Sequence, residues 1–233
     1  MTDLLSQIAS AWERLLELSA LILGIINGLI LLREYLRDRP KLMVEPIHPD
    51  TYQWFFKLPS RELHGHTTRK FGFLTYLSIT NRGLRDVSLN SWRLHIRTAG
   101  GKRYELRPMS TVEPSIRLGQ SDSVKTYAVL GVKGVVTEGE TWVRAGGGIA
   151  GFAYYLAEFF GGDQWNPVIK EGTVTETIVV SDVFGKKTSA KIVFKEIPLK
   201  KAKEMVKDID KIDAETLFND TIKWASIRSM ESE

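Results

Sequence analysis

The chain has 233 residues, of which 43% are hydrophobic and 26% are charged, and its formal net charge at pH 7 is +4. These values are typical of a globular protein and exclude intrinsic disorder as the main state. The absence of cysteine excludes disulfides and thiolate metal sites. Except after the apolar run described below and at Lys200 to Lys207, lysine and arginine are spread thinly along the sequence, so we expect no nucleic-acid partner.

An uncharged apolar run, LSALILGIINGLILL, occupies residues 18–32. Fifteen helical residues rise only about 22 Å, whereas the hydrocarbon core of a bilayer is roughly 30 Å thick. Adding Leu15 and Leu16 lengthens the run and places Glu17 inside it, where its carboxylate must reach the interface or a partner. The sequence therefore predicts a transmembrane segment at about residues 15–32. An interfacial helix and a helix buried in a soluble fold remain the alternatives.

Helical periodicity begins before this run, with Leu5, Ile8 and Trp12 on one face, so we expect one helix over about residues 3–38. A cleaved signal peptide needs a basic start, an early apolar run and a small-x-small cleavage site. The acidic start and the late apolar run do not fit that interpretation.

Basic residues flank the apolar run unequally. Arg14 precedes it alone, whereas Arg33, Arg37, Arg39 and Lys41 follow it. The positive-inside rule then keeps residues 33 onward in the cytoplasm and places the N-terminus outside. We therefore expect residues 1–40 to cross the cell inner membrane once, with these four cations at the lipid headgroups and the remaining chain in the cytosol.

A stripe of small residues follows one face of the apolar run. Ala20, Gly24 and Gly28 recur at four-residue spacing, and Asn27 lies beside them. Such a stripe lets membrane helices approach closely, and a buried amide can bond across the contact, which predicts a homo-oligomer formed through the helix. The alternative is that these residues have no such role, because Gly and Ala are common in membrane helices.

From residue 41 to 198 the pattern changes to short strand-like runs separated by turn residues. Phe71, Phe73 and Leu77 alternate with other residues, as do Trp92 and Leu94. Nine strands are expected, at residues 42–47, 52–58, 71–80, 87–98, 102–107, 123–130, 141–145, 173–180 and 187–195. This pattern predicts a mainly β domain built as an antiparallel β-sandwich, with a small β-barrel as the alternative.

Two stretches carry a resemblance to a known class of domain. Residues 76–92, YLSITNRGLRDVSLNSW, and the hairpin at 179–192, VVSDVFGKKTSAKI, resemble strand–turn–strand units of immunoglobulin-like domains in bacterial membrane-tethered proteins. The resemblance implies an immunoglobulin-like sandwich. It also implies a binding or spacer module more often than an enzyme.

Residues 145–165, AGGGIAGFAYYLAEFFGGDQW, interrupt the strand pattern. Because glycines open and close this aromatic run, we expect a helical or loop insertion here. A loop of this length inside a compact domain is often functional. The candidate contact residues, facing a pocket, another subunit or the bilayer, are Phe152, Tyr154, Tyr155, Phe159 and Phe160. The alternative is a helix that closes one end of the sandwich with these aromatics in the core.

The C-terminal segment, residues 199–233, shows helical periodicity in two parts, the second at about 214–228. These amphipathic helices are expected either to pack on the β-domain or to lie on the inner leaflet or in a partner's groove.

No catalytic, cofactor-binding or metal-binding motif is recognised. Gly146 to Gly148 do not form a phosphate loop. Glu62, His64 and His66, with His48, are conceivable metal ligands, but a solvated loop is the preferred interpretation. We likewise interpret Arg93, His95 and Arg97 as a solvated strand face.

The leading functional hypothesis is a single-pass membrane-anchored cytosolic β-domain that acts as an oligomeric binding, scaffold or sensor module. Its expected partners are the bilayer, further copies of the chain and an unidentified protein or small ligand. The first alternative is a membrane effector, in which the domain senses a ligand and the assembled helices perturb or permeate the bilayer, as in some bacterial defence systems. The second is an enzyme with an unrecognised site.

Overall fold

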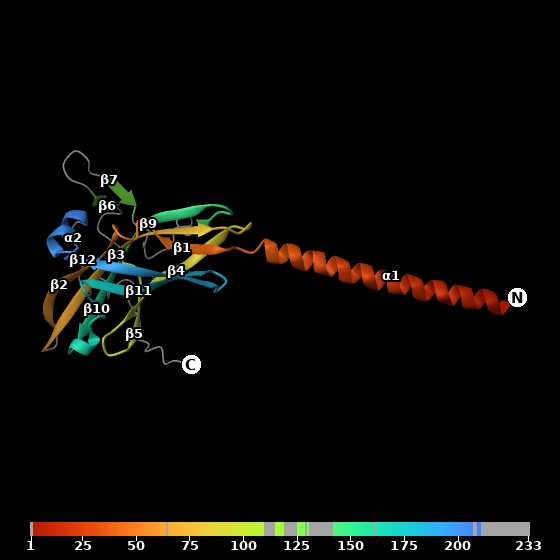
Figure 1. Cartoon of the computed structure of the whole chain (residues 1–233), viewed down its shortest axis with the longest axis horizontal. Coiled ribbons are helices and arrows are strands. Elements are labelled where there is room, and N and C mark those ends of the chain that lie inside the picture. Colours follow the sequence, from red (N-terminus) through yellow and green to blue (C-terminus); the bar gives the residue numbers. More distant parts are fainter. Residues whose placement is uncertain are drawn as a thin grey trace.

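The computed structural model describes residues 2–63, 65–109, 115–118, 125–128, 130, 142–160, 162–206 and 209–210. A long helix, α1 (Thr2–Arg37), projects from a β-rich body (Figure 1). It confirms the single helix expected over residues 3–38. The helix ends just before Pro40, which cannot continue the helical hydrogen-bond pattern.

Twelve strands are described in the body. They are β1 (Leu42–Pro46), β2 (Gln53–Leu63), β3 (His66–Asn81), β4 (Val87–Arg97), β5 (Arg103–Leu106), β6 (Ser115–Leu118), β7 (Lys125–Ala128), β8 (Trp142–Val143), β9 (Gly148–Phe160), β10 (Ile169–Lys170), β11 (Thr173–Asp182) and β12 (Lys187–Glu196). A 3₁₀ turn covers Asp163–Trp165, and a short helix, α2 (Leu199–Met205), follows the last strand.

Ten of these strands form one sheet, whose main order is β1-β3-β2-β12-β11-β4-β5, and β6 and β7 pair with each other in a second, two-stranded sheet. The long strand β3 has β9 along one edge and both β1 and β2 along the other. The sheet is mixed, because β12 runs parallel to β2 whereas the other pairs are antiparallel. The remaining strands, β8 and β10, extend the sheet at β4 and β11.

The sheet curls around an inner core. Phe73 of β3 meets Phe194 of β12 edge to face, with ring centroids 5.3 Å apart. The Tyr155 hydroxyl of β9 donates to the Trp92 carbonyl of β4 over 3.1 Å. Pro108, just after β5, forms an isolated bridge with Tyr155. The two ends of the sheet therefore approach each other across one buried apolar cluster.

A second core lies on the opposite face of β2, β3 and β9. Phe56, Leu74 and Tyr154 are buried there beneath Ile116 of β6 and Met205 of α2. These three strands are consequently buried on both faces. A strand in that position reads as a continuous apolar run rather than as an alternating one.

This double burial overturns the interpretation of residues 145–165 as a helical or loop insertion. Most of the segment is strand β9, which pairs with β3 from Thr68 to Thr80. The proposed contact loop is therefore wrong, since its residues alternate between the two cores. Phe152 and Tyr154 lie in the outer core, Tyr155 and Phe159 in the inner core, and Phe160 is partly buried at the end of the strand.

The mainly β prediction is confirmed, with three qualifications. The sheet is mixed rather than fully antiparallel, and its larger part is one continuous sheet. Strands β6, β9 and β10 were not expected from the sequence. Helix α2 begins at Leu199, where the first C-terminal helix was expected, and the helix predicted at 214–228 lies outside the described residues.

Candidate membrane interface

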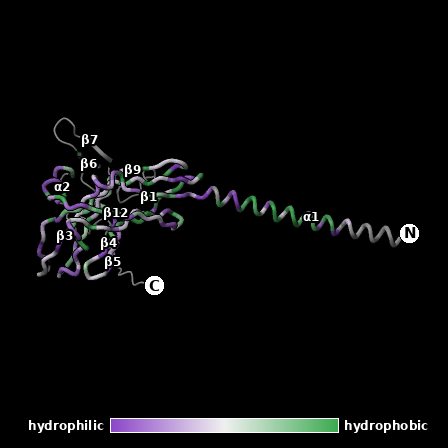
Figure 2. Tube along the Cα trace, in the orientation of Figure 1, coloured by the Kyte–Doolittle hydropathy of each residue, from purple (hydrophilic) through white to green (hydrophobic). Residues whose placement is uncertain are grey.

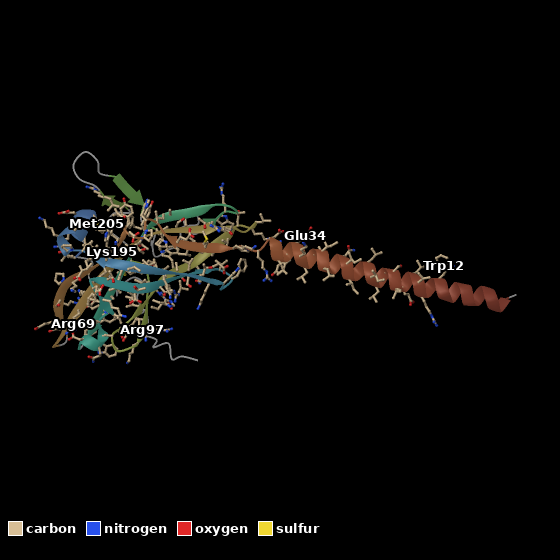
Figure 3. All side chains as sticks on the ribbon, in the orientation of Figure 1. Trp12, Glu34, Arg69, Arg97, Lys195 and Met205 are labelled. Carbon is tan, nitrogen blue, oxygen red and sulfur yellow. The ribbon has the colours of Figure 1, made fainter. Side chains whose placement is uncertain are left out.

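Helix α1 contains one segment long and apolar enough to cross a membrane, Arg14–Leu36, with 23 residues. None of its apolar window is buried against the body. In Figure 2 the hydrophobic colour of the helix lies in its middle part, and hydrophilic residues lie where it joins the body. In Figure 3 Trp12 and Glu34 project from the helix with no other element beside them. Length and composition make this segment a candidate span, and its exposed apolar surface would be unfavourable in water.

The small-residue stripe of the helix is exposed and contacts no other part of the described structure. Ala20, Asn27 and both glycines are exposed. A Cβ atom added at Gly24 or Gly28 would meet nothing within 4 Å. The stripe thus has room for a second helix, and association through it stays a prediction.

The cations that follow the apolar run at residues 18–32 lie in the last turns of α1 and in the linker to the body. Arg33, Arg39 and Lys41 are exposed, and the guanidinium of Arg39 lies 4.6 Å from the centroid of the Tyr35 ring. Arg37 ends α1, and its side chain is outside the described part. The four residues therefore lie on the stretch of chain between the apolar run and strand β1.

The turn between β3 and β4 holds this junction. The Lys41 amide donates to Asn81 Oδ1 over 3.1 Å, and the Arg82 amide donates to the Lys41 carbonyl over 2.8 Å. Gly83 is required by close approach, because an added Cβ would lie 2.3 Å from the Arg39 carbonyl oxygen and 2.7 Å from Pro40 Cα. The Asn-x-Gly turn seen in the sequence therefore anchors the end of the helix linker.

Two further turns join the same end of the body. In the turn before β9, the Asn81 amide donates to the Gly147 carbonyl over 2.8 Å, and the Gly146 amide donates to the Asn81 carbonyl over 2.9 Å. In the turn between β11 and β12, Lys186 Nζ donates to the Pro40 carbonyl over 3.3 Å. Figure 1 shows these tips beside the base of α1. We call residues 82–86, 142–147 and 183–186 together the helix-exit rim.

A basic surface covers the outer face of strands β4, β5, β11 and β12. Its outward-facing cations are Arg93, Arg97, Arg103, Arg107, Lys187, Lys191 and Lys195. Two carboxylates are described beside these cations: Glu105, which pairs with Arg93, and Asp50, whose Oδ1 lies 3.9 Å from Lys195 Nζ. Strand pairing gathers these cations from three separate sequence segments, although lysine and arginine are spread thinly along this part of the sequence. We call this surface the basic face.

His95 lies within the basic face. Its pKa is lowered, first by burial and then by the charges of Lys187, Arg93 and Arg103. Its Nε2 lies 3.6 Å from Glu105 Oε2. Because the ordinary pKa of histidine is already below 7, the lowered value keeps this side chain neutral at that pH.

Glu176 is a buried carboxylate that the sequence interpretation missed. It points to the inner core between Val174 and Ile178, and its two carboxylate oxygens accept the Arg97 amide over 3.1 and 3.0 Å. Burial raises its pKa to about 8, although the hydrogen bond from Arg97 opposes the shift. The signal available in the sequence was an acidic residue on the apolar face of an alternating strand.

The conceivable metal ligands do not form a described cluster. Glu62 is exposed near the end of β2, and His64 lies outside the described residues. The ring of His48 contacts Tyr52, with centroids 5.5 Å apart. Within the part of the chain that the structure describes, no group of three or more candidate metal-ligating side chains occurs.

No family model matches the chain, and no curated protein matches it. Among solved structures, a structural genomics target is 16% identical and aligns over 69% of this chain and 88% of its own, with a TM-score of 0.27. A protein described as ApaA from Bordetella pertussis is 12% identical and aligns over 68% of this chain and 96% of its own, also with a TM-score of 0.27. Similarity at this level carries no argument about fold or function.

Proposed function

We propose that this protein is a single-pass membrane-anchored binding module, in which α1 crosses the inner membrane and holds the β-body at the cytosolic surface. The observation that carries the proposal is the apolar span of α1, which finds no partner surface on the described body. An apolar helix of this length is stable in a bilayer, where its backbone hydrogen bonds are satisfied internally.

The charges beside the span support the orientation. Arg33, Arg39 and Lys41 lie at the end joined to the body, whereas Arg14 lies alone near the other end. Cations are retained on the cytoplasmic side, so the body belongs there and the N-terminus outside.

The basic face supports the binding role. Strands β4 and β12 begin next to the helix-exit rim and β11 ends there, so the basic face lies along the side of the body and not at the end joined to α1 (Figure 1). In the proposed orientation this face is open to the cytosol. No Phe, Tyr or Trp occurs among the outward-facing residues described on its four strands. Proteins that bind single-stranded nucleic acid use such rings for base stacking. An acidic segment of another protein is therefore the partner we propose.

Self-association through Ala20, Gly24, Asn27 and Gly28 would present several basic faces together and strengthen binding by multivalency. The immunoglobulin-like assignment, the bilayer-perturbing effector and the enzyme alternative stay hypotheses, without an observation that favours them.

The anchoring is tested by alkaline carbonate extraction of membranes that contain the full-length protein. We expect the protein to stay in the membrane fraction. Replacing Leu23 and Ile26 by lysine should release it, because each lysine at the centre of a membrane helix costs about 2.5–3.5 kcal/mol. Ser60→Lys with Asn90→Lys adds the same charge at exposed positions of the body and should leave the protein in the membrane. Extraction of the unmodified protein into the wash would overturn the anchoring.

A further inference from the structure

The helix-exit rim exposes large apolar side chains. Phe184 is 80% exposed, Leu84 60%, Val183 54% and Trp142 49%. They come from all three segments of the rim, although the body buries aromatic residues of the same types elsewhere. Large apolar side chains gathered at one end of a soluble body mark an interaction surface.

The turn that carries Phe184 is held in place from within the body. Asp182 is buried, and its Oδ1 accepts the amides of Phe184 and Lys186, each over 2.9 Å. The Gly185 amide donates to the Asp182 carbonyl over 3.0 Å, and Gly185 has a φ of 82°. These hydrogen bonds hold the turn in one conformation with Phe184 exposed at its tip. Because the turn is already ordered, inserting Phe184 into a partner surface costs less conformational entropy.

Cations lie between these apolar residues. Arg82, Arg85, Arg144 and Lys186 are exposed on the same turns. Asp86 is the rim's carboxylate, and its oxygens accept the Trp142 Nε1 proton over 3.3 Å and the Ala145 amide over 2.7 Å. Interleaved apolar and basic side chains suit the boundary between anionic headgroups and acyl chains.

The rim lies next to the end of the span. Leu36 is the last residue of the span, and the Arg82 amide of the rim donates to the Lys41 carbonyl over 2.8 Å. Leu36 and Lys41 are five positions apart in the chain, so their Cα atoms lie no more than roughly 17 Å apart. Once α1 is in the bilayer, this end of the body is held beside the headgroups.

We propose that the helix-exit rim docks on anionic lipid of the same bilayer that holds α1. Phe184, Val183 and Leu84 insert at the boundary of the acyl chains, while the rim's cations contact lipid phosphates. Docking fixes the orientation of the body relative to the bilayer, so that the basic face keeps a constant angle to the membrane. This inference rests on the proposed anchoring by α1.

Because the chain has no native cysteine, a single introduced cysteine can be labelled specifically with one environment-sensitive fluorophore. The full-length protein is reconstituted in phosphatidylcholine vesicles with and without phosphatidylglycerol. The label is placed at Val183→Cys in the rim, at Lys170→Cys on β10 at the far end of the body, and at Ile25→Cys in the span. Lipids with a quencher on the acyl chain report contact with the bilayer.

We expect the Val183 label to shift its emission to shorter wavelength and to be quenched by lipid when phosphatidylglycerol is present. The Lys170 label should keep the emission wavelength that it has in water and should not be quenched. The Ile25 label should be quenched in both vesicle types. Adding Phe184→Glu, or Arg85→Glu with Lys186→Glu, should restore the emission that the Val183 label has in water and should abolish its quenching by lipid. The Ile25 label should stay quenched.

The outcomes separate the two proposals. A Val183 label in water beside a quenched Ile25 label would overturn docking and leave the anchor intact, whereas an unquenched Ile25 label would overturn the anchor itself. Equal quenching of Val183 in both vesicle types would overturn the requirement for anionic lipid. A Val183 label shielded from water but not quenched by lipid would show that another copy of the chain covers the rim, and would overturn the lipid assignment.

Discussion

At Glu176 the fold buries an ionisable carboxyl group in an apolar core, which disfavours its charged form. The carboxyl group is only 5% exposed and projects from the apolar face of β11. A buried carboxylate loses hydration that one backbone donor does not replace, so the neutral form is favoured. Its neighbours in the strand, Val174 and Ile178, are fully buried, which explains the raised pKa.

The shift makes stability depend on pH. The pKa of Glu176 is about 8 in the folded protein and 4.5 without the fold. Between these values the folded state holds a proton that the unfolded state has released, so stability falls as pH rises through this window and then levels off. Glu176→Gln should remove this fall and, near pH 8, add stability on the order of a few kcal/mol.

Urea unfolding of the full-length protein in detergent, followed across this pH range, checks the Glu176 prediction. Glu45→Gln changes an exposed strand carboxyl and serves as the matched control. A slope that survives in Glu176→Gln, or that disappears in Glu45→Gln, would contradict it.

At the scale of elements, β9 decides how the body is assembled. It pairs with β3 along thirteen positions and contributes side chains to both cores. Tyr154 and Tyr155 are adjacent, so they point to opposite faces of the strand. The Tyr155 hydroxyl donates to the Trp92 carbonyl of β4, whereas the buried Tyr154 hydroxyl has no partner among the described residues.

These adjacent tyrosines allow a matched test of β9. Tyr155→Phe should lower the free energy of unfolding by about 0.5–1.5 kcal/mol, because it removes a buried hydrogen bond. Tyr154→Phe should be neutral or slightly stabilising, since it removes a buried hydroxyl that lacks a partner among the described residues. Thermal or urea unfolding of both variants gives the comparison. Equal small effects would be expected for an exposed contact loop and would argue against the strand arrangement.

At the scale of the whole molecule, the distribution of charge over the surface has more influence on partner binding than the net charge. The chain carries a net charge of only +4, yet seven cations lie on the basic face, with the carboxylates Glu105 and Asp50 described beside them. Across β4, β11 and β12, His95, Thr177 and Lys191 occupy one row. A surface of this kind attracts acidic partners at low ionic strength.

Binding of fluorescent polyglutamate to the full-length protein in neutral detergent tests the basic face. Lys187→Glu with Lys191→Glu should weaken binding about tenfold or more at low salt, and added salt should weaken binding to the unmodified protein. Lys200→Glu with Lys201→Glu makes the same change in net charge at exposed positions of α2 and should have a much smaller effect. Equal losses in both variants would contradict a localised site. Tighter binding of a single-stranded oligonucleotide of equal charge would contradict the choice of an acidic protein segment.

The sequence by itself determined the features that depend on neighbours along the chain. The apolar run at 18–32 and the cations after it predicted α1, Pro40 predicted its end, and the Asn81-Arg82-Gly83 turn predicted the β3–β4 connection. Most strands followed from alternation, which one buried face imposes. The transmembrane role and the orientation drawn from the same residues stay predictions.

Only the tertiary structure decided the features that depend on contacts between distant residues. Strand β9 has no alternation because both of its faces are buried, so its apolar sequence was mistaken for an insertion. The basic face and the helix-exit rim each combine side chains more than ninety positions apart in the chain, such as Arg93 with Lys187 and Leu84 with Phe184. Local patterns report periodicity and turn chemistry, whereas strand pairing and sheet curvature decide which surfaces those residues form.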